Sequence, residues 1–74
     1  MRSFNFALVL EDDEPADPPA FLTVIPTWRE GDEFLAGRHL QRFRILGISP
    51  VDDHELRKTF QAFWLVAPIN PSAG

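Results

Sequence analysis

The segment from Trp28 to Ser49 constrains the fold of this chain more than any other segment. Two turn signals, at Gly31 and Gly37, precede the longest run of alternating side chains in the sequence. Within that run, arginines alternate with Phe43 and Ile45. This pattern is typical of two strands joined by a tight turn. We therefore expect the segment to form the central hairpin of a small, mostly β domain.

The alternation changes partway along the second strand of this hairpin. Phe43 and Ile45 lie on one face of an extended chain, whereas Leu46 and Ile48 lie on the opposite face. A regular strand could not bury both pairs against a single core. Glycine at position 47 is the residue expected at a bulge or a barrel corner. The pattern predicts a bend near Leu46 and Gly47, and positive φ angles at the two turn glycines.

The chain has 74 residues, which is enough for one domain over residues 1–74. It has no cysteine, so neither disulfides nor thiolate metal sites can stabilise it, and the seven Phe and two Trp must supply the core. The lack of cysteine fits a cytoplasmic location. We expect no signal peptide, because the first apolar run meets four acidic residues. The longest apolar stretch, 63–69, is too short to span a membrane.

Other strands are expected on either side of the central hairpin. Residues 3–10 alternate with a period of two, and residues 21–25 form a short β-rich run. Between them, residues 11–20 hold five carboxylates and three prolines, which predicts a surface loop without strand or helix. The carboxylate spacing does not match a calcium-binding loop, so we predict no metal site.

The last third of the chain leaves two interpretations open. Ser49 and Pro50 are a favourable helix start, and residues 56–63 have apolar side chains at helical spacing, but part of this stretch is also rich in strand-forming residues. We favour a short helix near 50–58 and a strand near 61–67, followed by a frayed tail over 68–74. The fold class predicted is mainly β: a small five-stranded antiparallel, SH3-like barrel with one short helix before the last strand.

Several segments resemble a group of small uncharacterised bacterial proteins, chiefly actinobacterial. The resemblance covers roughly the first half of the chain, and it implies no activity, substrate or catalytic residue. The likeness to SH3-like barrels is an analogy of fold, which cannot carry function. The residues that carry the resemblance are Leu10-Glu11-Asp12, Glu14-Pro15-Ala16-Asp17-Pro18-Pro19-Ala20-Phe21, and Pro26-Thr27-Trp28 with Gly31-Asp32.

The candidate binding residues are Trp28 and three arginines on the long strand, Arg38, Arg42 and Arg44. Alternation places the arginines on one face, and arginine binds phosphate or carboxylate and stacks on flat rings. A second interpretation is that these arginines pair with the chain's own carboxylates, each exposed pair contributing about 0–1 kcal/mol. Trp28 is expected either to cap the open end of the barrel or to form a platform for a ligand.

Catalytic motifs are not apparent in the sequence. The two histidines, His39 and His54, lie outside recognised nucleophile motifs, and neither Gly31 nor Gly37 begins a phosphate-binding loop. We therefore expect no catalytic residues, no cofactor and no enzymatic activity.

Two functions remain. The favoured hypothesis is a noncatalytic protein-interaction module that binds a protein partner or a second copy of itself, because a basic strand face and an acidic loop share one small domain. The alternative is a small barrel that binds single-stranded nucleic acid through the Arg38, Arg42 and Arg44 face. The net charge of −4 disfavours the alternative.

Overall fold

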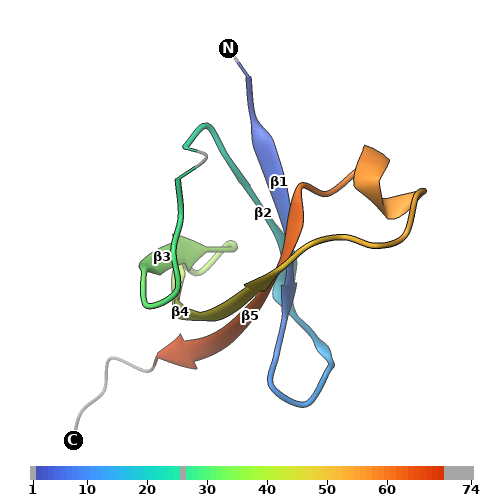
Figure 1. Cartoon of the computed structure of the whole chain (residues 1–74). Helices are drawn as coiled ribbons and strands as arrows, with labels where there is room; N and C mark the ends of the chain where they lie inside the picture. The colour runs from blue at the N-terminus through green and yellow to red at the C-terminus, as the bar shows by residue number, and fades with distance from the viewer. Residues whose placement is uncertain (1, 26, 70–74) are drawn as a thin grey trace, which may run out of the picture.

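The strands form one sheet in the order β2-β1-β5-β4-β3, which curls into a half-barrel (Figure 1). The structure, a computed structural model, describes residues 2–25 and 27–69. The prediction of a mainly β fold is confirmed. The elements are β1 (Phe4–Val9), β2 (Pro15–Thr23), β3 (Glu33–Ala36), β4 (Gln41–Ser49), a 3₁₀ turn η1 (Leu56–Lys58) and β5 (Ala62–Ile69).

The hairpin predicted from the sequence is β3–β4, but it lies at one end of the sheet. The pairs Phe34–Phe43 and Ala36–Gln41 define its register, and residues 37–40 form the turn. The expectation of a central hairpin is wrong, because β5 takes the central position with β1 on one side and β4 on the other.

The pairing of β1 with β5 is parallel, from Phe6–Ala62 to Val9–Leu65, whereas the other three pairings are antiparallel. The prediction of an entirely antiparallel sheet is therefore wrong. The long connection through η1 brings the chain back so that β5 runs alongside β1 in the same direction (Figure 1). Side chains alternate in the same way in parallel and antiparallel strands, so the alternation in the sequence could not predict the direction of β5 relative to β1.

Irregularities in the ladders produce the curl. The β4–β5 register shifts between Ile45 and Gly47, which confirms the predicted bend. Gly31 and Asp32 together oppose Ile45: the Gly31 N–H donates to the Ile45 carbonyl, and the Ile45 N–H donates to the Asp32 carbonyl. This is the geometry of a G1 bulge. A third shift separates Ala7 from Val9 in the β1–β2 ladder.

The acidic, proline-rich segment is partly a strand, contrary to the prediction of a loop. β2 begins at Pro15 and includes Pro18 and Pro19. Proline is tolerated there because β2 is an edge strand, and a missing N–H on its outer side breaks no ladder. Residues 16–19 also fall where the ladder shifts, opposite the single residue Leu8.

The last strand is longer than expected for a similar reason. Pro68 was predicted to end it and to begin a frayed tail, but β5 continues through Pro68 to Ile69. β1 pairs with β5 only as far as Leu65, so one edge of β5 is free at Pro68. Residues 70–74 lie outside the part of the chain that the structure describes.

The predicted helix near 50–58 is reduced to the single 3₁₀ turn η1. Ser49 belongs to β4, and the side chain of Asp53 accepts hydrogen bonds from the backbone N–H groups of Glu55 and Leu56. Val51 is buried, and its carbonyl accepts a 2.6 Å bond from Arg57 Nε, which holds this segment as a loop. No helix within residues 2–25 and 27–69 is long and apolar enough to cross a membrane.

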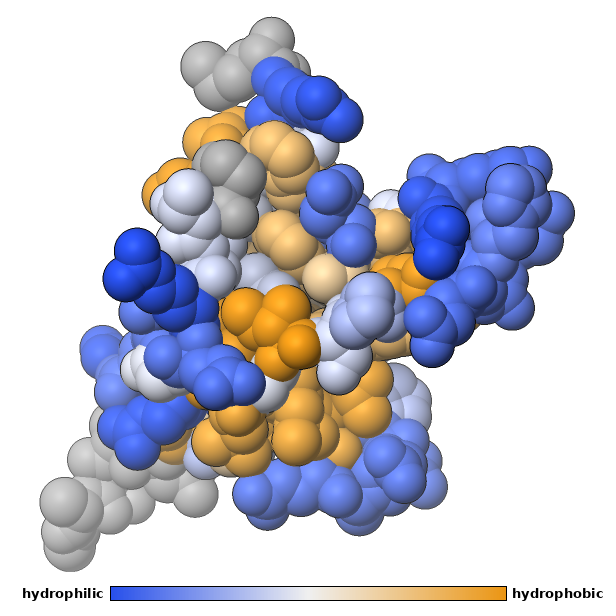
Figure 2. Space-filling model, viewed as in Figure 1, coloured by the Kyte–Doolittle hydropathy of each residue, from blue (hydrophilic) through white to orange (hydrophobic). Residues whose placement is uncertain are grey.

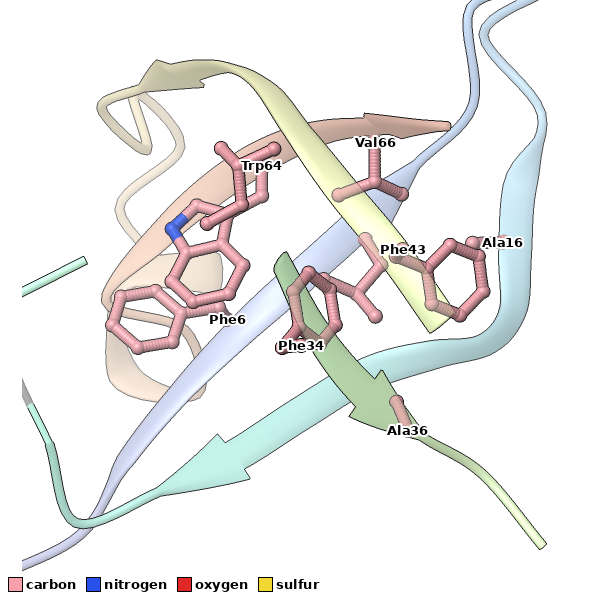
Figure 3. Packing of buried hydrophobic residues seen from close by; sticks show 9 residues of the cluster. Phe6, Ala16, Phe34, Ala36, Phe43, Trp64 and Val66 are labelled. Atoms are coloured by element: carbon pink, nitrogen blue, oxygen red, sulfur yellow. The ribbon is translucent and has the colours of Figure 1, made fainter. Parts of the chain in front are cut away.

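The core lies inside the curl and is mainly aromatic. The rings of Phe6 and Trp64 stack with centroids 4.2 Å apart, and Phe34 meets Trp64 edge-on at 5.3 Å. Figure 3 shows Phe34, Trp64 and Phe43 converging from different strands. The buried cluster comprises Phe6, Leu8, Ala16, Phe34, Ala36, Phe43, Ile45, Trp64 and Val66.

The edges of the half-barrel, β2 and β3, leave a seam that side chains fill. At one end, the β3–β4 turn meets β2, where a Cβ on Gly37 would lie 2.9 Å from Cδ of Pro18. At the other end, Phe21, Trp28 and Phe34 are in aromatic contact. The two edges therefore lie close together at Gly37, and aromatic side chains pack between them at Trp28.

We expect Gly37→Ala to destabilise the domain more than Gly31→Ala. Both glycines have positive φ, 84° and 93°, as predicted, so either alanine introduces strain of about 1–2 kcal/mol. Only Gly37 would also force a methyl group against Pro18, adding about 1–3 kcal/mol, because nothing lies within 4 Å of the Gly31 position. Urea unfolding of both variants checks this. Equal losses would show that the seam does not resist a side chain at position 37.

Candidate functional site

Trp28 is positioned by the tight turn that leads into β3. The Arg29 N–H donates to Asp32 Oδ2 at 2.9 Å, and the Asp32 N–H donates to the Arg29 carbonyl at 3.1 Å. Trp28 immediately precedes this turn and lies half-buried against the core. The two bonds fix where the chain enters β3, and so they fix where the indole ring meets the seam.

The Trp28 ring rests on three aromatic neighbours. Its centroid lies 5.7 Å from that of Phe21, 6.1 Å from Phe34 and 5.5 Å from Trp64. Its Nε1 is buried and has no hydrogen-bond acceptor among the described residues. A buried donor without a partner costs about 1–3 kcal/mol, and native structures hold few of them. Trp28 is therefore well packed, but its indole N–H lacks a hydrogen-bond acceptor among the described residues.

A cleft of about 490 Å³ opens beside this ring, between the end of β2 and the edge of β3. Figure 2 shows apolar side chains at the upper left, around the end of β2, with hydrophilic side chains below them towards β3. We call this the seam cleft. Its lining residues are Phe21, Thr23, Ile25, Trp28, Glu33, Phe34, Leu35 and Arg42.

A three-residue charge network forms the polar side of the seam cleft. Arg42 Nη1 lies 3.2 Å from Glu33 Oε1, and Arg44 Nη2 lies 2.9 Å from Glu33 Oε2. Both arginine side chains are about half exposed. Arg44 faces Glu33 directly across the β3–β4 ladder, and Arg42 faces Leu35. Two guanidinium groups and one carboxylate leave this network with a net charge of +1.

Hydrogen bonds from Arg44 and then Arg42 hold the pKa of Glu33 below its ordinary value of 4.5. Because the pKa is lower in the folded state, this contribution to stability is fully present above pH 4.5 and is lost as the pH falls through the lowered value. We expect Arg44→Ala to raise the pKa of Glu33 more than Arg42→Ala does. An NMR titration of the Glu33 side-chain carbon measures both, with Lys58→Ala as the unchanged control. A larger rise from Arg42→Ala would reverse the assignment.

The structure brings together three of the four candidate residues. Trp28 and Arg42 line the same cleft, and Arg44 joins through its ion pair with Glu33. Arg38 lies apart, in the turn between β3 and β4, beside Asp17 of β2. The expectation that Arg38 shares the strand face is wrong, because the alternating strand begins only at Gln41.

The interpretation that the arginines pair with the chain's own carboxylates is confirmed for two of them, and the binding of a partner stays a prediction. Arg42 and Arg44 do pair with a carboxylate of the chain, and they remain half exposed. Sequence reasoning missed Glu33 as the shared partner, although the hairpin register contained the signal. In that register Glu33 and Leu35 fall opposite Arg44 and Arg42, on the same face of the sheet.

The two histidines lie in different loops of the chain. His39 lies exposed in the β3–β4 turn, and His54 lies exposed in the connection before η1. Within residues 2–25 and 27–69, no group of three or more histidine, aspartate or glutamate side chains could hold a metal ion.

Comparison with known proteins adds no relative. No family model, curated protein or solved structure matches this chain. The geometry of the seam cleft is therefore the basis on which a function can be argued.

Proposed function

We propose that this protein is a noncatalytic protein-interaction module and that the seam cleft is its binding site. The observation that carries the proposal is that Trp28 and Arg42 line one open cleft. Tryptophan and arginine are enriched among the residues that dominate binding energy at protein interfaces. The cleft is also lined by the apolar side chains of Ile25 and Leu35, which are about half exposed.

The shape of the site favours a short segment of a partner over a broad, flat interface. The cleft follows the β3 edge for the length of a few residues, and Ile25 and Leu35 are about half exposed on its sides. An inserted side chain would bury this apolar surface, at about 25 cal/mol per Å² of area removed from water. Arg42 then offers a charged hydrogen bond at the rim, where it fixes orientation.

Affinity capture with matched variants tests the proposal. The immobilised protein is incubated with lysate of the source cells, and bound proteins are quantified by mass spectrometry. We expect a partner that wild type and Lys58→Ala recover equally and that Arg42→Ala recovers at least tenfold less. Lys58 is the matched control because it loses the same charge from η1, on the opposite side of the molecule from β3 (Figure 1). Equal recovery by all three proteins, or none by wild type, would contradict the proposal.

Self-association is one form of this function. A second copy would offer its own extended segments to the seam cleft. Static light scattering across a concentration and salt series measures this directly. A mass that rises with concentration in wild type and stays monomeric in Arg42→Ala supports self-association through the cleft, and a strict monomer in both rules it out.

Binding of single-stranded nucleic acid is a second candidate, favoured by one observation. The seam cleft combines an aromatic ring with an arginine. Proteins that bind single-stranded nucleic acid stack bases on aromatic rings and hold the phosphates with basic side chains. The carboxylate of Glu33 between Arg42 and Arg44 opposes phosphate, so we rank this second. Fluorescence anisotropy with labelled oligonucleotides decides, since salt-sensitive binding is required. The SH3-like analogy of fold stays a prediction and favours neither function.

A further inference from the structure

The backbone of β3 has unused hydrogen-bonding groups on its outer side. The Ile45 N–H donates to the Asp32 carbonyl, so the backbone of Asp32 faces β4. In an antiparallel ladder the groups facing the partner alternate, so Phe34 and Ala36 also face β4. The N–H and C=O groups of Glu33 and Leu35 therefore point away from β4. Among the described residues they have no backbone partner.

The other edge of the sheet is not equivalent. β2 carries Pro15, Pro18 and Pro19, which lack the N–H that a new strand would need. Edge prolines are one of the ways in which proteins prevent strand pairing. β3 has no proline, and Glu33 and Leu35 both line the seam cleft. The open edge of the sheet and the candidate binding site are thus the same place.

Charges beside this edge define what an added strand should carry. Arg44 holds Glu33 by the shorter ion pair, 2.9 Å against 3.2 Å for Arg42. Arg42 can therefore turn to a second carboxylate while Arg44 keeps Glu33 neutralised, and the net charge of +1 favours that exchange. Arg42 and the exposed Leu35 lie on the outer face of the sheet, whereas Phe34 and the Trp28 ring lie on the inner side.

We propose that β3 binds an extended peptide as an added strand through the backbone groups of Glu33 and Leu35. The peptide carries an acidic side chain for Arg42 and, next to it in sequence, a large apolar side chain for the Trp28 wall. We place the two next to each other because successive side chains of a strand point to opposite faces and both must reach the same cleft. This mode of recognition takes affinity from main-chain bonds and specificity from the flanking side chains. The inference rests on the proposed function and names the partner of the same site.

Selection from a library of random seven-residue peptides displayed on phage tests the side-chain rule. We expect the selected peptides to share an aspartate or glutamate directly beside a large apolar residue. Binding of a synthetic consensus peptide should weaken at least tenfold with Arg42→Ala and remain unchanged with Lys58→Ala. A failure to select any sequence, a consensus without an acidic residue, or equal binding by Arg42→Ala would overturn the inference.

Amide hydrogen exchange with the same peptide tests the backbone rule. At saturation, exchange at Glu33 and Leu35 should slow at least tenfold, whereas Phe34 and Ala36, already bonded to β4, should change little. Methylating alternate backbone nitrogens of the peptide should abolish binding in one register only. If a captured partner depends on Arg42 but Glu33 and Leu35 stay unprotected, strand addition is wrong and the interaction module stands. If no captured partner depends on Arg42, the strand-addition proposal and the proposed function are both wrong.

Discussion

Replacing Trp64 with alanine is expected to remove a large part of the domain's free energy of unfolding at 25 °C. Trp64 is almost fully buried, at 1% exposure, and its ring stacks on Phe6 and contacts Phe21, Trp28 and Phe34. Removing such a ring costs about 3–5 kcal/mol. The free energy of unfolding is about 0.05–0.15 kcal/mol per residue, so a domain of this size has a total free energy of unfolding of roughly 4–11 kcal/mol. The substitution removes much of that.

Circular dichroism during urea unfolding measures the effect of Trp64→Ala. Leu22→Ala is the matched control, because Leu22 is 66% exposed on the outer side of β2 and should change stability by less than about 0.5 kcal/mol. A loss below about 1 kcal/mol for Trp64→Ala would show that the aromatic cluster does not form the core of the domain.

Two substitutions of Trp28 are expected to distinguish the contribution of ring packing from that of the indole N–H. Trp28→Ala removes three aromatic contacts from a half-buried site and should cost about 2–3 kcal/mol. Trp28→Phe keeps a ring in the seam and removes the indole N–H, whose burial without an acceptor costs about 1–3 kcal/mol. Its stability should therefore fall within about 1 kcal/mol of wild type, because the smaller ring and the lost orphan donor offset each other.

The same urea experiment decides between these outcomes, with partner capture as a second readout. Trp28→Ala should lose capture along with stability. A Trp28→Phe variant as unstable as Trp28→Ala would mean that the indole N–H does have an acceptor. The indole N–H would then stabilise the folded state through a hydrogen bond, instead of costing free energy as a buried donor without an acceptor.

The sequence predicted those features of the fold that depend on local pattern. Alternation located β1 and β4, strand-forming residues located most of β5, and the placement of Gly31, Gly37 and Gly47 predicted two turns and a bulge. The parallel β1–β5 pairing was missed, because strand direction leaves no trace in alternation. The strand predicted over 21–25 matches the end of β2, but the proline-bearing part of β2 before it was missed, because proline is excluded only from strands paired on both sides.

The candidate site was predicted as a set of residues but not as a geometry. Trp28 and Arg42 were named from residue type, and it is the curl of the sheet that brings them to one cleft. Arg38 was included because the alternation was extended one turn too far, to a residue that precedes Gln41. Glu33 was absent because its role depends on the hairpin register, which fixes it between two arginines.

Native-state hydrogen exchange of the free protein tests most directly whether the β3 edge is open. NMR resolves each backbone amide, and exchange is followed without any ligand. The structure predicts slow exchange at Phe34 and Ala36, which bond to β4, and fast exchange at Glu33 and Leu35. Protection of Glu33 and Leu35 equal to that of Phe34 would show that the edge is already paired. The seam cleft would then not be free to bind a strand.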